Sequence, residues 1–297
     1  MKRYNKSLRT MIFVPGYKVK FLDKAIDFPS DGLILDLEDS VPDGFKDEAR
    51  KNIHEHLDKN VYKQQVFIRV NDIESGMLSD DLKATLHENT TGFMFTKIID
   101  EKDIYYLDKL LTQLEIDNGF EIGKFKMCPL IETGSAVLRA YEIAKASNRI
   151  IALAFGGEDY LTDLDGLHKE HGVSLLVPRS LIVIASRTAK IDAIDTPYLD
   201  ISNLKGFEKE ANLARELGFS GTLILHPNQI DLANKVFSPS EEEIKEAYRI
   251  KEAIEKSEKE GSGVTLLDNK LVGPPMLKRA MNVIRKVEKI NGNLKSN

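Results

Sequence analysis

Residues 32–40 read GLILDLEDS, in which a short run of aliphatic residues gives way to acids. A strand of a parallel sheet is buried on both faces and is nearly continuous in apolar residues, so charges are expected only where it ends. Runs of this kind recur along the chain, and each is followed by a longer amphipathic segment. The runs are residues 10–14, 32–37, 66–70, 92–96, 127–131, 150–155, 193–196 and 222–225.

The segments between these runs are long enough for crossover helices, the clearest at residues 101–115, 135–146, 175–189 and 204–217. Alternating strands and helices are typical of a parallel sheet. An open doubly wound sheet usually has a glycine-rich, nucleotide-binding turn after its first strand, but this turn reads Val14-Pro15-Gly16-Tyr17. We therefore predict an α/β protein in which residues 1–237 form a TIM (β/α)₈ barrel.

Residues 238–297 are expected to form a C-terminal helical appendage that covers the barrel mouth as a lid. Ser238-Pro239-Ser240 introduces a charged helix from residue 241 to about residue 259. Gly261-Ser262-Gly263 is interpreted as a hinge, and a last helix is expected at about residues 276–290.

The composition limits the partners. The 297-residue chain has a formal net charge of −5 with acids and bases interspersed, which argues against binding to nucleic acid and favours a small-molecule partner. The one cysteine, Cys128, has apolar neighbours and is expected to be a buried thiol. The basic amino terminus leads into an apolar stretch too short for a signal peptide, and no stretch reaches the about 20 apolar residues of a membrane span. We expect a soluble, cytoplasmic protein.

Several of the apolar runs end in charged residues. Parallel strands of a barrel all end at the same rim, where barrel enzymes keep their chemistry, so these side chains are expected to share one pocket. Glu132 and Asp159 would follow adjacent strands about 4.8 Å apart, close enough to ligate one Mg²⁺. Arg69 offers a fork of donors for a substrate carboxylate or a developing oxyanion. The rim residues are Asp36, Glu38, Asp39, Arg69, Asn71, Lys97, Glu132 and Asp159.

A structural interpretation of the same charges stays open. Buried charges need partners, so ion pairs could seal the barrel top without taking part in catalysis. Asp36, Glu38 and Asp39 could orient Arg69 or Lys97. His226 ends the eighth run and could touch substrate or support its loop. The other histidines singled out, His54, His56, His168 and His171, have no metal-ligand spacing.

Five short motifs, taken in order, resemble those of a known family. They are residues 9–16 (RTMIFVPG), 36–40 (DLEDS), 69–71 (RVN), 131–133 (IET) and 157–160 (GEDY). With residues 226–230 (HPNQI) and the tail they extend over nearly the whole chain. Together they resemble the citrate lyase beta-subunit-like branch of the HpcH/HpaI aldolase family. The resemblance implies a TIM barrel assembled as a homo-oligomer, a trimer or a hexamer.

For the site, the resemblance implies Mg²⁺ held by Glu132 and Asp159 and a substrate held by Arg69. It implies that relatives cleave or form a carbon–carbon bond in citryl, malyl or citramalyl thioesters of coenzyme A or acyl carrier protein, through an enolate that metal and arginine stabilise. The expected function is therefore that of a Mg²⁺-dependent carbon–carbon lyase. The substrate-binding residues expected in all are Arg9, Pro15, Gly16, Lys18, Arg69, Lys97 and Glu132.

The tail departs from the family pattern. Residues 269–275 read NKLVGPP, and Gly273 stands where the resemblance implies an aspartate that acts as acid or base. Asp268, five residues earlier, is a candidate substitute. Two alternatives follow from this departure: an aldolase acting on a free hydroxy-keto acid, or a non-catalytic subunit that binds metal and ligand.

Overall fold

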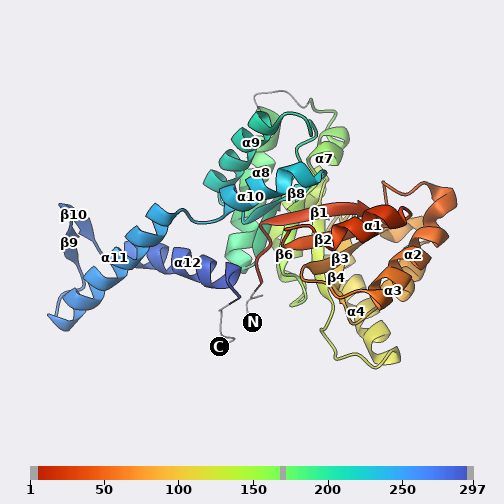
Figure 1. Ribbon diagram of the computed structural model, residues 1–297, viewed down its shortest axis with the longest axis horizontal. Coiled ribbons are helices and arrows are strands. Elements are labelled where there is room, and N and C mark those ends of the chain that lie inside the picture. Colours follow the sequence, from red (N-terminus) through yellow and green to blue (C-terminus); the bar gives the residue numbers. More distant parts are fainter. Residues whose placement is uncertain (1–5, 168–171, 293–297) are drawn as a thin grey trace. The chain divides into compact units, whose positions relative to one another are not determined.

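The computed structural model describes residues 6–167 and 172–292, and it divides into two compact units. The first unit comprises residues 8–235, and the second contains residues 236–292 together with Lys6 and Ser7. Figure 1 shows the strands and helices of both units and labels most of them. Within the described residues, no helix combines the length and the apolar character needed to cross a membrane.

The first unit is a closed barrel of eight parallel strands, which confirms the predicted fold class. Pairing of Thr10 in β1 with Thr222 in β8 closes the cylinder. Every predicted run coincides with a strand to within two residues at each end. The strands are β1 (Thr10–Pro15), β2 (Gly32–Asp36), β3 (Gln65–Val70), β4 (Thr90–Phe95), β5 (Lys126–Ile131), β6 (Ala152–Phe155), β7 (Asp192–Asp195) and β8 (Gly221–Ile224).

The strands are buried on both faces because side chains fill the interior and helices pack outside. Every residue of β2, β3, β6 and β8 is buried, which is the reason these runs lack a polar alternation. Phe67, Phe93 and Phe155 are among the largest fully buried side chains. The ring centroids of Phe93 and Phe95 lie 6.2 Å apart, within the usual range for packed aromatic pairs.

The barrel helices follow the predicted order, with one difference. The segment predicted as a single helix at residues 135–146 is two helices, because Arg139 has φ −109° and ψ 14°, outside the helical range. The helices of the first unit are α1 (Val19–Ala25), α2 (Lys46–Lys59), α3 (Leu78–Thr85), α4 (Glu101–Asp117), α5 (Gly134–Leu138), α6 (Ala140–Lys145), α7 (Gly157–Asp163), α8 (Val173–Ala189) and α9 (Leu204–Leu217). Helix α10 (Ile230–Phe237) spans the boundary between the units.

The second unit is a helical hairpin with a small sheet. Helix α11 (Glu241–Lys259) begins as predicted, with Ser240 and Glu243 forming a capping box. The sequence analysis missed the antiparallel strands β9 (Thr265–Leu267) and β10 (Lys270–Val272), which are joined by two residues with positive φ, Asp268 and Asn269. Helix α12 (Pro274–Ile290) packs on α11 around a core of Ala247, Ile250, Ile254, Val272, Ala280 and Ile284.

Candidate active site

Arg69 and Asp36 form a buried, two-pronged ion pair at the ends of neighbouring strands. The register of β2 and β3 sets these residues side by side. Nε and Nη2 of Arg69 donate to the two carboxylate oxygens of Asp36, each at 2.7 Å. Burial alone would raise the pKa of Asp36, but the charge and hydrogen bonds of Arg69 outweigh it and hold that pKa below its usual value. Arg69 is therefore a fixed cation at the rim.

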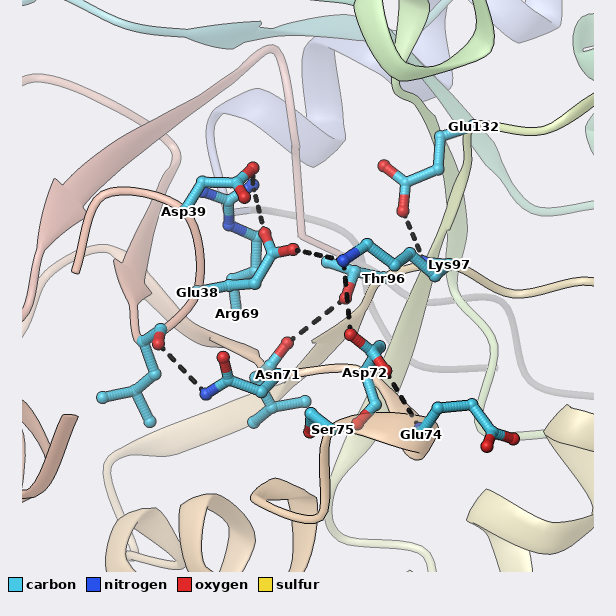
Figure 2. Close-up of polar contacts among 12 residues, drawn as sticks. Glu38, Asp39, Arg69, Asn71, Asp72, Glu74, Ser75, Thr96, Lys97 and Glu132 are labelled. Carbon is cyan, nitrogen blue, oxygen red and sulfur yellow. Dashed lines mark hydrogen bonds and ion pairs between the residues drawn. The ribbon is translucent and has the colours of Figure 1, made fainter. Parts of the chain in front are cut away.

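Two further carboxylates approach the remaining nitrogen of the guanidinium (Figure 2). Nη1 of Arg69 lies 2.9 Å from Oε2 of Glu38 and 3.3 Å from Oδ2 of Asp39. Glu38 is buried, whereas Asp39 is exposed. Burial raises the pKa of Glu38 to about 7. The charge of Arg69 opposes this rise, and the charge of Asp39 adds to it. The ion pairs fit both sequence interpretations, acids that orient Arg69 and structural ion pairs that seal the barrel top.

The rim segment that carries Glu38 is held by Lys46, which the sequence analysis missed. Nζ of Lys46 donates to the carbonyl oxygens of Leu37 and Glu38 at 2.8 and 2.9 Å, and to Oδ1 of Asn71 at 2.9 Å. Lys46 is buried and is the first residue of α2, where a helix disfavours a positive charge. That unfavourable position is the sequence signal that could have drawn attention to it.

Lys97 contacts Glu132 through its backbone and Glu38 and Asp72 through its side chain (Figure 2). Its N–H donates a short hydrogen bond to Oε1 of Glu132, and its backbone is left-handed, with φ 53°. Nζ of Lys97 lies 3.3 Å from Oδ2 of Asp72 and 3.7 Å from Oε1 of Glu38. The side chain is 57% exposed, so its ammonium also faces solvent at the barrel mouth.

Glu132 and Asp159 follow the neighbouring strands β5 and β6, whose register pairs Ile131 with Phe155. Glu132 is buried and Asp159 is exposed. Burial raises the pKa of Glu132 to about 8; the N–H of Lys97 opposes this shift, and the charges of Asp159 and Glu38 add to it. Burial and the charge of Asp39 raise the pKa of Asp159 as well. Negative charge at this part of the rim is therefore incompletely balanced.

This donor set suits a hard divalent cation. Among the residues that the structure describes, no group of three or more His, Cys, Asp or Glu is arranged to hold a metal ion by itself. Mg²⁺ commonly takes only one or two protein carboxylates and completes its octahedron with water and substrate oxygens. A buried carboxyl with a raised pKa beside a second carboxylate provides such a pair, because a bound cation would offset the charge that disfavours ionisation.

The end of β1 reaches the same rim. Pro15 pairs with Asp36, and the N–H of Gly16 donates to the carbonyl oxygen of Asp36 at 3.0 Å. A Cβ on Gly16 would lie 2.8 Å from that oxygen, so this close approach requires glycine. Lys18 is exposed, with Nζ 5.0 Å from the ring centroid of Tyr17. Pro15, Gly16 and Lys18 thus follow β1 at the same rim as Asp36.

Arg9 does not lie at this rim, which corrects the expectation that it helps to bind the carrier. It precedes β1 and therefore lies at the amino ends of the strands, the opposite end of the barrel. There its Nη2 forms an ion pair of 2.6 Å with Oδ1 of Asp31, and its Nε donates to Oδ2 of Asp31 at 2.8 Å. These contacts give Arg9 a structural role.

The remaining candidates have local partners. Nδ1 of His226 accepts from the N–H of Asn228 at 3.3 Å, so this histidine caps the short helix that follows β8. Asp268 pairs with Arg249 within the second unit at 2.7 Å. Cys128 is buried, as predicted, and burial raises its pKa to about 12, which makes it a poor nucleophile. His168 and His171 lie outside the described residues.

A closed parallel barrel with carboxylates and cations gathered beyond the carboxyl ends of its strands defines the class of TIM-barrel enzymes. The chain belongs to the HpcH/HpaI aldolase/citrate lyase family, whose model matches residues 9–227. The resemblance drawn from the short motifs is thereby confirmed.

Relatives over the full length agree with this assignment. Citrate lyase subunit beta of Escherichia coli K12 is 35% identical over 288 residues, covering 97% of this chain and 95% of the relative. L-malyl-CoA/beta-methylmalyl-CoA lyase of Rhodobacter capsulatus is 30% identical and covers 94% of each chain. The relatives are named lyases, so the prediction of an enzyme similar to citrate lyase beta subunits is confirmed.

A solved structure of similar shape contains the expected cofactor. Protein CitE of Mycobacterium tuberculosis, in complex with magnesium, acetoacetate and coenzyme A, matches with a TM-score of 0.77 and 26% identity, covering 95% of this chain and 99% of the other. The prediction of magnesium as the cofactor is borne out in that relative.

Proposed function

We propose that this chain is a Mg²⁺-dependent carbon–carbon lyase acting on a carboxylated acyl thioester such as citryl-, malyl- or citramalyl-CoA. The observation that carries the proposal is the rim itself. Glu132 and Asp159 follow adjacent strands with unbalanced negative charge, beside the fixed cation Arg69. Full-length relatives named for citrate, malyl-CoA and citramalyl-CoA support the substrate class.

In this proposal Glu132 and Asp159 would hold Mg²⁺. When bound, the ion supplies Lewis-acid polarisation of the keto-acid oxygens. Lys97, whose ammonium faces the barrel mouth, and Arg69 provide positive charge for the substrate carboxylate and the enolate oxygen. Pro15, Gly16 and Lys18 line the side at which the thioester carrier enters.

The reaction is balanced without a redox partner. The hydroxyl group of the substrate loses its proton, the adjacent carbon–carbon bond breaks, and the electron pair passes to the thioester half as an enolate. The keto acid leaves, and the enolate carbon takes up a proton. Gly273 has no side chain to transfer these protons. Glu38 is suited to the task because burial raises its pKa to about 7, near the working pH.

The test is to incubate the purified protein with Mg²⁺ and citryl-, malyl- or citramalyl-CoA, and to follow release of oxaloacetate, glyoxylate or pyruvate. Turnover with one thioester, lost on chelation with EDTA and in E132Q, would support the proposal. If none of the three thioesters released a keto acid, the proposal would be contradicted. Calorimetry with coenzyme A distinguishes a thioester enzyme from an aldolase of free hydroxy-keto acids, because only the former should bind the carrier.

Gly273 specifically favours a second candidate, a subunit that binds metal and ligand without turnover. That function predicts calorimetric binding of Mg²⁺ and keto acid but no product. A homotrimer or hexamer and a cytoplasmic location remain predictions, the first of which is measured by light scattering of the purified protein.

A further inference from the structure

The turn Gly156-Gly157, which connects β6 to α7, is packed between side chains of two neighbouring strands. A Cβ on Gly156 would lie 2.7 Å from Cβ and 2.8 Å from Oε2 of Glu132. A Cβ on Gly157 would lie 2.8 Å from Oγ1 of Thr196. These separations are shorter than van der Waals contact, so neither position has room for a side chain. The turn is thus held between the residue that follows β5 and the residue that follows β7.

Hydrogen bonds fix the same turn from both sides. The N–H of Gly156 donates to the carbonyl oxygen of Ile131, and the N–H of Gly157 donates to Oγ1 of Thr196, each at 3.0 Å. Gly157 is the first residue of α7, and its N–H has no acceptor within the helix. Gly156, at the N-cap position, offers no side chain as an acceptor. Thr196 therefore provides, from another strand, the capping contact that the local sequence lacks.

Thr196 is itself firmly placed. It follows the last residue of β7, and it is buried. Its carbonyl oxygen accepts a hydrogen bond of 3.1 Å from Oγ1 of Thr222 on β8. Because β7 and β8 are part of the closed barrel, the position of the Thr196 hydroxyl is set by the barrel rather than by the surface loops.

Asp159 is the third residue of α7, two positions after Gly157. The helix has seven residues, and a second polar contact lies at its far end, where Oδ2 of Asp163 accepts from the N–H of Gly134 at 2.8 Å. The contact with Thr196 is therefore the anchor nearer to Asp159 in the helix. We propose that Thr196 is a positioning residue, which holds the Gly156-Gly157 turn so that the Asp159 carboxylate stands beside Glu132. This inference rests on the proposed role of those two carboxylates in holding Mg²⁺.

The test compares two substitutions at position 196 that differ only in the side-chain hydroxyl group. T196S and T196A both lack the methyl group, but only T196S retains a hydroxyl that can accept from Gly157. Mg²⁺ binding to the purified full chain is measured by calorimetry. We expect T196A to bind Mg²⁺ about 10-fold more weakly and T196S to stay within about twofold of the unaltered protein, as is typical when a residue supporting a ligand is lost.

T90V is the matched control for a loss of stability alone. Thr90 is also a buried barrel threonine, and its Oγ1 donates to the carbonyl oxygen of Thr85 at 2.8 Å, at the amino end of β4. We expect T90V to lower the free energy of unfolding as T196A does, since each loses one buried hydrogen bond, but to leave Mg²⁺ binding unchanged.

The outcomes separate the two proposals. If the unaltered protein binds Mg²⁺, E132Q does not, and T196A binds as well as T196S, the metal site stands and the role of Thr196 is overturned. If T90V weakened Mg²⁺ binding as much as T196A does, the role of Thr196 would be overturned as well. The weaker binding would then be explained by the loss of stability alone. If the unaltered protein binds no Mg²⁺, the proposed function and this inference fail together. Should T196A fail to fold, T196V, which keeps the side-chain volume, replaces it in the comparison with T196S.

Discussion

The backbone N–H of Lys97 donates a hydrogen bond to Oε1 of Glu132, and Lys97 does so from a left-handed conformation with φ 53°. A residue with a Cβ pays about 1–2 kcal/mol for that conformation. The contact joins the end of β4 to the end of β5, where the candidate metal ligands begin. Backbone strain of this kind is found at functional sites that the surrounding structure holds in place.

Substitutions of Lys97 distinguish the effect of its backbone conformation on stability from the effect of its side chain. Glycine adopts a left-handed conformation without a steric cost, whereas alanine does not. We therefore expect K97G to have a free energy of unfolding about 1 kcal/mol greater than that of K97A, although both lose the pairs with Glu38 and Asp72. Urea denaturation measures the difference. Equal stability of the two variants would show that position 97 is not strained.

The buried pair of Asp36 and Arg69 gives the fold a defined dependence on pH. The pKa of Asp36 is lower in the folded chain than the reference value of 3.8. Such a carboxyl stabilises the fold above the unfolded pKa, and that contribution is lost as the pH falls through the folded pKa. We expect D36N to cost about 3–5 kcal/mol at pH 7, because it leaves a buried guanidinium without its main partner.

The difference in stability between the unaltered protein and D36N should be constant from about pH 7 to pH 5 and should shrink below pH 3.8. Denaturation of both proteins across this range measures it. S30A is a suitable control, because Ser30 is buried but its hydroxyl has no hydrogen-bond partner in the described structure. A difference that grew at low pH would contradict the lowered pKa.

The strands and the rim acids were predictable because their signals are local. A short run such as residues 32–35, apolar and followed by an acid, is typical of a buried parallel strand that ends at a rim. The parallel arrangement then brings Asp36, Arg69 and Glu132 to one rim without further information. Arg9 was misplaced because that expectation came from the family resemblance, whereas its position before β1 puts it at the opposite end of the barrel.

Lys46 and Thr196 were missed for a different reason. Each contacts a segment outside its own element, Lys46 the carbonyl groups after β2 and the side chain of Asn71, and Thr196 the first amide of α7. Nothing in the neighbouring sequence specifies those partners, because they depend on how helices and strands return to the rim. The two-residue turn between β9 and β10 was also missed, because the preceding Gly261-Ser262-Gly263 was interpreted as a hinge between helices.

Lys46 should be important for stability. K46M keeps an unbranched chain of similar length but leaves two carbonyl oxygens and Oδ1 of Asn71 without this donor. We expect a loss of about 2–4 kcal/mol in the free energy of unfolding, since buried polar groups would lose their partner. K51M on the exposed face of the same helix is the control and should change stability by less than about 0.5 kcal/mol. Comparable losses in the two variants would contradict the structural role of Lys46.

Gly273 offers a test of whether an acidic residue at this position would assist proton transfer. It is the N-cap residue of α12, with φ −154° and ψ −168°, an extended conformation open to any residue. A Cβ there would lie 3.2 Å from Cγ1 of Val264, an exposed side chain with room to shift. Pro274 and Pro275 have no N–H to donate, and Met276 N–H already donates to the Gly273 carbonyl at 3.0 Å, so a new cap would gain little.

We therefore expect G273D to change the free energy of unfolding by less than about 0.5 kcal/mol, which allows its activity to be compared directly with that of the unaltered chain. If proton transfer limits the proposed lyase, the new carboxylate should raise kcat by about 100-fold, the lower end of general acid–base effects. G273N is the matched control, since it has the same size and capping ability but no proton to transfer. Equal rates in G273D and G273N would place proton transfer with another residue, and Glu38, with a pKa of about 7, would then be the first to substitute.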